Sequence, residues 1–526
     1  MEIKVLENAQ ELPTLAQLLL EDKLKPDEKS QMVFGETSDG KVYCLIYKNA
    51  STQTKSRAAT IRAFSFPNKT VSLLYTTQEI IQIIRDAAHE LEEINLTSDT
   101  DLEKKFTAIL VDSLKAGASD IHFEVYPNMA DIKLRINGML FTVSQMDSKT
   151  INRLINYMYN VAATEGSKDT QFNIEEMQDA LLDRQVEVDG VRKHIKIRLQ
   201  TAPCYPNSIS IVMRLLRIEN QLSSTLSSLG YTPPQIKTLQ RAQMKPTGAT
   251  IIAGTTGSGK STTLATLLSE IHVNSRGSKK ILTAEDPPEF AIPGANQINL
   301  SNKRQEMEGD EDMFVKAIKV AMRCDPDVIM VGEVRDKQSS QLLSSAVLSG
   351  HQVFTTIHAS SALSIVDRLY NLGFDLYIMT SPNFLSLLIY QTLLPILCQK
   401  CCINAKTFFA KNKTAPVEAL KERLTLLCEH DETAWDHIRF SSEVGCDHCR
   451  MGYTGRTVAA EMIEPDTTML NYFRNNQLAQ ASQYWKDTGG RTVLDNAIEK
   501  MVMGNVDPRS VEDRCGLIQL TQKRSE

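Results

Sequence analysis

The most informative stretch for chemistry is residues 248–261, GATIIAGTTGSGKS, where a short apolar run leads into a glycine-rich octapeptide. The octapeptide fits G-x-x-x-x-G-K-[ST] at every position. Its glycines can take positive φ, so that consecutive backbone N–H groups converge on an anion. Lys260 supplies a point charge for the β- and γ-phosphates of a nucleotide, and Ser261 is suited to ligate Mg²⁺. The candidate phosphate-binding residues are Gly254, Thr255, Thr256, Gly257, Ser258, Gly259, Lys260, Ser261 and Thr262.

A helix is expected to begin at the end of this loop and to point its positive end at the same anion. The alternative is a flexible Gly/Ser loop with a chance lysine. A strand before the motif and a helix after it are the context that phosphate binding requires, so the flanking sequence favours the phosphate site.

The segment from about 236 to 395 alternates apolar runs with helical patterns, which predicts a parallel sheet with helices on both faces. The four candidate strands are 249–253, 281–284, 328–331 and 352–357. Directly after them come the glycine-rich loop, Glu285-Asp286, Glu333 and His358. Because ligands bind at the carboxyl ends of parallel strands, we expect these groups to face one nucleotide.

Phosphoryl transfer needs charge neutralisation and a positioned water. Lys260 and a magnesium ion on Ser261 would supply the first, and Glu285 or Glu333 could orient the water while the other acid holds the metal shell. The alternative for each acid is a solvated loop residue or a helix cap. A lone histidine at a strand end, such as His358, is more often structural, and His351 could equally be a helix-end residue.

Two cysteine pairs form the second pattern with metal-ligand spacing, Cys398-x-x-Cys401 and Cys446-x-x-Cys449. Four thiolates around tetrahedral Zn²⁺ would make a closed structural site. Residues 402–445 between the pairs are longer than in a compact ribbon, and Cys402 could compete as a ligand. Free buried thiols are the alternative. The chain has 10 cysteines, and we expect a cytosolic protein in which disulfides are rare.

The rest of the chain predicts several further domains. Residues 1–95 form a small docking or spacer module, with a hairpin turning at Asp39-Gly40 and a helical pattern over 76–94. Residues 96–218 predict an α+β domain, with a helix starting near Asp99 and hairpin turns at Asn137-Gly138 and Asp189-Gly190. Residues 219–235, rich in Ser with a Pro pair, predict a linker.

Composition narrows the function classes. The net charge of −6 and the absence of a basic cluster argue against a nucleic-acid motor, which needs a basic track. The first residues lack the basic and apolar regions of a secretory signal, and the apolar stretch 384–398 is too short to span a membrane. We therefore expect a cytoplasmic protein.

With these residues in place, residues 98–526 resemble the secretion ATPase superfamily, specifically the hexameric assembly motors of type IV pili and type II secretion. The motifs occur in the order of that family, and they are ASDIHFE, RING, GTTGSGKSTTL, TAEDPPE, RCDPDVIMVGEVRD, SGHQVFTTIHASSA, LCQKC and GCDHCRMGYTGR. The tetracysteine site favours an assembly or secretion motor over a retraction motor, which lacks it.

The resemblance implies an ATPase that forms a homo-hexamer and binds an inner-membrane platform protein at the cytoplasmic face of the inner membrane, with membrane association through partners. By matching motifs, Glu285 is the general base, Glu333 the acid near Mg²⁺ and His358 a γ-phosphate sensor. The cofactors are ATP, Mg²⁺ and structural Zn²⁺. Arginines of the middle domain close on the nucleotide in this family, and the candidates here are Arg135, Arg198 and Arg214, with Arg323 and Arg335 from the core.

The chain departs from the family pattern at several places. The family's Gln-Asp-Gly-Arg turn is here residues 178–181, QDAL, so one customary arginine is missing. Its Gly-Glu-Arg reads SIS at 208–210, the polar pair after His358 is Ser360-Ser361, and the arginine before the first cysteine pair is absent. These differences indicate a divergent branch, for which the type IVb pili are the candidate. Residues 1–95 lack the family's cyclic-dinucleotide motif.

The predicted fold class is α/β, a RecA-like P-loop NTPase core with an α+β (PAS-like) middle domain, a small N-terminal domain and a zinc-knuckle insertion. The predicted divisions are 1–95, 96–218, the linker 219–235, the core 236–395, a tetracysteine subdomain 396–460 and a C-terminal helical subdomain 461–526. Two functions compete with the motor for pilin or secreted protein: a DNA-translocating, conjugation-type ATPase and a scaffold that binds ATP without hydrolysing it. No direct nucleic-acid partner is expected, and intact Lys260, Glu285 and Glu333 argue against the scaffold.

Overall fold

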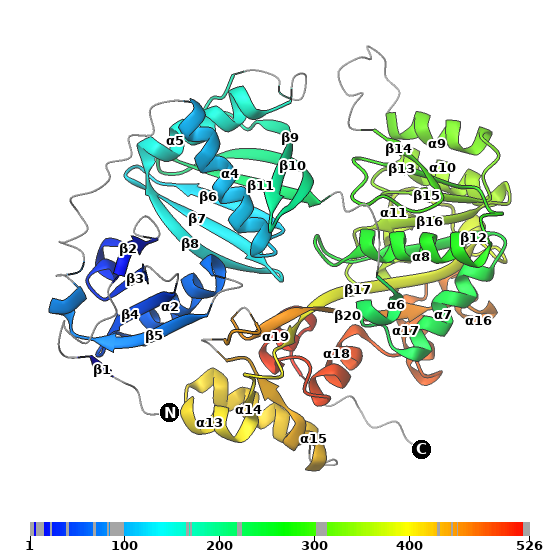
Figure 1. Cartoon of the computed structure of the whole chain (residues 1–526). Helices are drawn as coiled ribbons and strands as arrows, with labels where there is room; N and C mark the ends of the chain where they lie inside the picture. Colours follow the sequence, from blue (N-terminus) through cyan, green and yellow to red (C-terminus); the bar gives the residue numbers. More distant parts are fainter. Residues whose placement is uncertain are drawn as a thin grey trace. The chain divides into compact units, whose positions relative to one another are not determined.

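The computed structural model of the chain contains two compact units (Figure 1). The first comprises Met1–Arg217, Cys398–Cys402 and Ser441–Thr454, and the second Ile218–Leu397, Ile403–Phe440 and Gly455–Glu526. The residues that the structure describes are 5–6, 15–20, 24–37, 41–66, 70–81, 84, 99–164, 168, 171–217, 224–300, 313–428, 432–442, 445–449 and 451–518.

The first unit begins with a five-stranded sheet of order β1-β5-β4-β3-β2, packed around buried apolar side chains of β3, β4 and α2. Its elements are β1 (Val5–Leu6), β2 (Leu15–Leu19), α1 (Pro26–Lys29), β3 (Met32–Thr37), β4 (Val42–Tyr47), α2 (Thr52–Ser65) and β5 (Val71–Thr76). The antiparallel pairing of β3 with β4 confirms the predicted hairpin. Its Asp39-Gly40 turn, and most of the helical pattern over 76–94, lie outside the described residues.

A six-stranded sheet of order β8-β7-β6-β11-β10-β9 follows in the same unit, and its neighbouring strands are antiparallel. Its elements are α4 (Asp99–Lys115), β6 (Asp120–Val125), β7 (Met129–Ile136), β8 (Met139–Asp147), α5 (Ser148–Tyr157), a π-helical turn (Met158–Ala162), β9 (Asp179–Val188), β10 (Val191–Cys204) and β11 (Ser208–Arg217). Asn137 and Gly138, and Asp189 and Gly190, all have positive φ. Left-handed residue pairs of this kind match the twist of a tight hairpin, so both predicted turns are confirmed.

The second unit is built on a seven-stranded sheet of order β14-β13-β15-β16-β12-β17-β20. From β14 to β17 in this order, neighbouring strands are parallel. The strands are β12 (Gly248–Ala253), β13 (Ile281–Glu285), β14 (Ala295–Asn299), β15 (Val328–Val331), β16 (Gln352–Ile357), β17 (Leu385–Leu397) and β20 (Tyr453–Ile463). The four strands predicted in this segment are confirmed within one residue at each end.

Helices cover both faces of this sheet because its strands are apolar on both sides. One face packs against α9, α10, α11, α16 and α17, and the other against α6, α7 and α8. Figure 1 shows α8 (green) beside this sheet. The helices are α6 (Leu226–Leu229), α7 (Pro233–Met244), α8 (Lys260–Asn274), α9 (Met313–Arg323), α10 (Lys337–Leu348), α11 (Ser364–Asn371), α12 (Leu376–Met379), α16 (Thr467–Arg474) and α17 (Leu478–Asp487).

A further cluster of the second unit joins residues 403–440 to the end of the chain. Its elements are β18 (Ile403–Asn404), α13 (Ala405–Lys411), α14 (Ala415–Cys428), α15 (Glu432–His437), β19 (Arg439–Phe440), α18 (Val493–Val502) and α19 (Pro508–Cys515). The cysteine-bearing segments 398–402 and 441–454 group with the first unit instead. The segment 396–460 is thus divided between the two units.

The predicted linker over 219–235 is wrong for much of its length. Residues 226–229 form α6, with Thr225 and Ser228 in a reciprocal capping box, and α7 starts at Pro233 with proline in its first turn. A segment rich in Ser, Thr and Pro predicts a linker, but the same residues are also favoured at helix starts. Leu226 and Tyr231 are buried against α8, so this segment is part of the core.

Among the described residues, no helix has both the length and the apolar character needed to cross a membrane.

Replacing Gly230 by alanine should destabilise the second unit more than replacing Gly489, although both have left-handed φ, +99° and +95°. An added Cβ at Gly230 would lie 1.9 Å from Thr457 Oγ1, whereas Gly489 faces open space. Thr457 is β-branched and has few rotamers with which to yield. We expect Gly489→Ala to cost about 1 kcal/mol and Gly230→Ala about 1–3 kcal/mol more, measured by thermal unfolding. Equal losses would contradict this packing.

Candidate functional site

The glycine-rich loop after β12 adopts the backbone conformation that its sequence predicts. Gly254, Gly257 and Gly259 have positive φ of 156°, 77° and 84°. A Cβ on Gly254 would lie 2.4 Å from both the carbonyl oxygen of Gln391 and the Oγ of Ser258, so no larger residue fits there. The loop residues 255–257 are exposed, and Ser261 and Thr262 lie in the first turn of α8. This concave run of N–H groups suits a phosphate.

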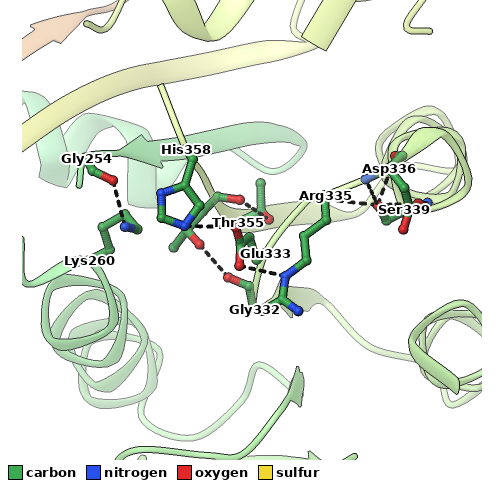
Figure 2. A network of polar contacts seen from close by, with 10 residues as sticks. Gly254, Lys260, Gly332, Glu333, Arg335, Asp336, Ser339, Thr355 and His358 are labelled. Carbon is green, nitrogen blue, oxygen red and sulfur yellow. Dashed lines mark hydrogen bonds and ion pairs between the residues drawn. The ribbon is translucent and has the colours of Figure 1, made fainter. Parts of the chain in front are cut away.

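Lys260 opens helix α8 and folds back over the loop. Its Nζ donates to the carbonyl oxygen of Gly254 at 2.8 Å (Figure 2). It also donates to the carbonyl oxygen of Thr255 at 3.1 Å. Burial lowers the pKa of Lys260, whereas the negative charges of Glu333 and Glu289 act in the opposite direction. The lysine therefore lies in the field of an acid from another strand end.

The sheet order brings the predicted polar groups to one edge. Glu285 ends β13, Glu333 lies two residues after β15, His358 follows β16 directly, and the loop follows β12. These strands are neighbours in the order β13-β15-β16-β12. At about 4.8 Å per strand, the end of β13 lies roughly 14 Å from the end of β12.

Glu333 is the centre of the contacts at this edge. Its Oε1 lies 3.1 Å from His358 Nε2 and its Oε2 accepts from Arg335 Nε at 2.8 Å (Figure 2). Backbone and hydroxyl bonds across the neighbouring strands hold the turn, with Gly332 N–H donating to Ala284 O and Thr356 Oγ1 donating to Gly332 O at 2.6 Å. The carboxylate thus lies between the imidazole of His358 and the guanidinium of Arg335.

Glu285 has a different environment. Its Oε1 accepts from Thr283 Oγ1 at 2.7 Å and from Gln297 Nε2 at 2.9 Å. Burial raises the pKa of Glu285, while these two donors oppose the rise and Glu289 adds to it. A carboxylate with a raised pKa is a better proton acceptor than an ordinary glutamate, which suits a general base.

The other histidine considered from sequence, His351, is a helix-end residue. Its Nδ1 lies 3.0 Å from Ala346 O and 3.0 Å from Ser349 Oγ, at the end of α10. Of the two candidate arginines in this unit, Arg335 contacts Glu333, whereas Arg323 is the exposed last residue of α9.

The three arginines predicted from the first unit form one row across its six-stranded sheet. Arg135 pairs with Asp120, Asp120 with Arg214, and Arg214 with Arg198, on the strands β7, β6, β11 and β10. Directly paired residues of neighbouring strands share a face. Asp120 Oδ1 accepts from Arg214 Nε at 3.2 Å, and Arg135 Nη1 donates to Gly138 O at 3.2 Å. The sheet therefore presents three guanidinium groups on one face.

The position of the missing family arginine belongs to the same row. Leu181 of β9 pairs with Arg198 of β10, so it extends the row by one strand. An arginine at Leu181 would lie beside Arg198 on the same face. With leucine at position 181, the row has one guanidinium group fewer than the family pattern would give.

The four predicted zinc ligands lie together. The Sγ atoms of Cys398, Cys401, Cys446 and Cys449 are all within 4.8 Å of one another, with distances of 3.7 Å for Cys398–Cys446 and 3.5 Å for Cys401–Cys449. Four sulfurs bound at about 2.3 Å to one tetrahedral ion would be about 3.8 Å apart. The donor set fits Zn²⁺. Cys402 is not one of the grouped residues.

Three buried polar residues beside the site escaped prediction. Gln391 lies within the mostly apolar strand β17, and Tyr231 lies in the segment predicted as a linker. Glu461 is the acidic residue of β20. Glu461 accepts from the backbone N–H of Ala362, four residues after His358, at 2.6 Å. A polar side chain inside an otherwise apolar strand is the signal that could have found Gln391 and Glu461, because burial requires a hydrogen-bond partner.

Comparisons with known proteins agree with this geometry. Residues 95–513 match the family described as Type II/IV secretion system protein. The type IV pilus assembly ATPase PilB of Pseudomonas aeruginosa is 33% identical over 358 residues, which are 68% of this chain and 57% of PilB. The type II secretion system ATPase E of Vibrio cholerae is 30% identical over 413 residues, 77% of this chain and 74% of that protein.

The fold has a solved counterpart in the ATPase DotB of Legionella pneumophila. That structure superimposes with a TM-score of 0.55 at 20% identity and covers 80% of this chain and 96% of DotB. At this identity the likeness concerns the fold alone. Because the family match covers most of the chain, from the middle sheet to α19, the chain belongs to the type II/IV secretion system protein family.

Proposed function

We propose that this protein is an ATP-hydrolysing hexameric motor that powers pilin polymerisation or type II-like protein secretion from the cytoplasmic face of the inner membrane. Family membership and relatives named as secretion and pilus assembly ATPases support it. The observation that carries the ATPase chemistry is the convergence of the glycine-rich loop, Glu285, Glu333 and His358 at one sheet edge. Its partners are five further copies of the chain and an inner-membrane platform protein of the pilus or secretion machine.

The fold proposed for this function is a RecA-like core on the seven-stranded sheet. β16 lies between the loop strand β12 and the Glu333 strand β15, which supports this assignment. The antiparallel six-stranded sheet is the PAS-like middle domain, the segment before it the docking domain, and the cysteine cluster a zinc knuckle. The proposed domains are those expected from the sequence, without the linker: 1–95, 96–218, 236–395, 396–460 and 461–526.

In this motor the loop N–H groups and Lys260 hold the β- and γ-phosphates, and Ser261 and Glu333 hold the magnesium shell. Glu285 accepts the proton of the attacking water, and His358 contacts the γ-phosphate. Mg²⁺ bound there would neutralise phosphate charge. The arginine row of Arg135, Arg198 and Arg214 supplies guanidinium groups that stabilise the transition state. Arg335 is a stronger core candidate than Arg323, because it contacts Glu333.

Lys260→Ala should abolish ATP hydrolysis, lowering turnover by about a hundredfold or more, because it removes the charge that neutralises the phosphates. The matched control is Lys245→Ala in the same unit, whose Nζ donates to Ser386 O and pairs with Glu464 away from the loop. Phosphate release measures both. Wild-type turnover in Lys260→Ala would refute the site.

The same assay separates the motor from the DNA-translocating alternative. A translocase would be stimulated by DNA in a salt-dependent manner. We expect no stimulation, and strong stimulation would favour the alternative even if the Lys260 result is as expected.

Thr283→Val should move the acid limb of the kcat/KM profile to higher pH. The hydroxyl of Thr283 stabilises the ionised form of Glu285, so its loss raises the pKa of the base further. Below that pKa the base is protonated and turnover falls, whereas the alkaline limb stays in place. Thr250→Val, a buried threonine of β12, is the control. An unshifted acid limb would exclude Glu285 as the base.

Cys398→Ser should lower bound zinc, measured by elemental analysis of the purified protein, because it removes one of four thiolates of a closed site. The control is Cys402→Ser, which changes the neighbouring cysteine outside the grouped four and should retain the metal. Solubility should fall only in the first variant. Zinc content that follows Cys402 instead would reassign the ligands.

A further inference from the structure

A chain of buried polar contacts links Tyr231 to the glycine-rich loop. The hydroxyl of Tyr231 donates to Gln391 Oε1 at 2.6 Å, and Gln391 Nε2 donates to the carbonyl oxygen of Ser258 at 2.8 Å. Thr263 Oγ1 lies 3.0 Å from the Tyr231 hydroxyl and 3.2 Å from Gln391 Oε1. Tyr231 is 4% exposed, and Gln391 and Thr263 are fully buried. The path joins the short connection between α6 and α7 to strand β17 and then to the loop.

The contacts satisfy groups that would otherwise be costly to bury. An amide inside an apolar strand loses its bonds to water, and unsatisfied it would cost on the order of 1–3 kcal/mol. Gln391 has a partner on each side of its amide, Tyr231 on the oxygen and Ser258 on the nitrogen. Burial raises the pKa of Tyr231 far above its ordinary value, so its hydroxyl remains a donor. Tyr231 therefore gives the shorter of two bonds that orient the Gln391 amide, the other coming from Thr263.

The bond to Ser258 controls a phosphate-binding group. The Ser258 carbonyl and the Gly259 N–H belong to one planar peptide unit and point in opposite directions. With the carbonyl held by Gln391 of β17, the Gly259 N–H points to the opposite side, away from that amide. Gly259 has a φ of 84° and no side chain to hold this peptide in place. Gln391 therefore supplies the constraint that the glycine lacks.

The end of the path at Tyr231 is itself anchored. Gly230 is packed against Thr457 and Val458 of β20, and Lys500 Nζ donates to its carbonyl oxygen. The Tyr231 ring packs with Leu226 of α6 and the apolar face of α8. A displacement of the segment 224–231 would therefore reach the loop through Tyr231.

Resting on the proposed function, we propose that Tyr231 is a positioning residue for ATP: acting through Gln391, its hydroxyl holds the Ser258–Gly259 peptide in the orientation that binds the nucleotide phosphates. Tyr231 acts through another residue and does not touch the nucleotide. Its effect should therefore fall on nucleotide affinity more than on the chemical step. A purely structural tyrosine would affect stability alone.

The test is Tyr231→Phe, which removes the hydroxyl and keeps the ring. We expect the Kd for a non-hydrolysable ATP analogue, measured by calorimetry, and the KM for ATP to rise about five- to tenfold, with a smaller change in kcat. The control is Tyr453→Phe, whose hydroxyl lies 3.0 Å from Ser441 Oγ, buried in the first unit. This control should lower the melting temperature to a similar degree without changing Kd.

A second variant keeps the inference testable if Tyr231→Phe does not fold. Gln391→Met breaks the same path at its centre and should raise Kd at least as much. The double variant should bind no more weakly than Gln391→Met alone, because both substitutions remove one path. Additive losses, or an unchanged Kd in folded Tyr231→Phe, would overturn the role of Tyr231 and leave the ATPase assignment intact. A wild-type protein that binds no ATP would overturn both.

Discussion

The glycine-rich loop has few side chains that could stabilise its own conformation. Contacts from neighbouring parts of the second unit therefore stabilise it. Gly254, Gly257 and Gly259 give the loop its conformation, but they offer no side-chain contacts. Support comes from the neighbours of β12. On one side, the Gln391 backbone of β17 packs closely against Gly254, and the Gln391 side-chain amide donates to the Ser258 carbonyl oxygen. On the other side, β16 is followed directly by His358. One neighbour of β12 therefore supports the loop, and the other carries a candidate catalytic residue.

The polar side chains at the sheet edge are paired across strands, and this pairing offsets part of the desolvation free energy of burying a charge. Glu333 contacts His358 from β16 and Arg335 from its own turn, and its field reaches Lys260. Glu285 instead is held by neutral donors in a buried setting, which raises its pKa. Two glutamates at equivalent strand ends therefore have different chemistry. Glu333 contacts an imidazole and a guanidinium, whereas burial makes Glu285 a stronger base.

The first unit uses register instead of sequence proximity to group its cations. Arg135, Arg214 and Arg198 come from three strands, and antiparallel pairing brings them onto one row with Asp120 between two of them. A shift of one residue in any pairing would move an arginine to the opposite, buried face. The hairpin turns at Asn137-Gly138 and Asp189-Gly190 determine register through their positive φ. The Leu181 position shows that this row can lose a member without loss of the sheet.

The sequence by itself determined the local structure: the loop, the four strands before polar residues, the hairpin turns and the cysteine spacing all follow from short-range rules of φ, periodicity and ligand geometry. It did not determine which strands are neighbours, and only that order joins Glu333 to His358 and separates both from the Thr283 and Gln297 environment of Glu285. The sequence pattern also predicts a linker where residues 226–235 form α6 and the start of α7, because Ser, Thr and Pro are common in linkers and at helix starts alike. Only packing against α8 and β20 decided that Tyr231 is buried, since burial depends on contacts between residues far apart in the chain.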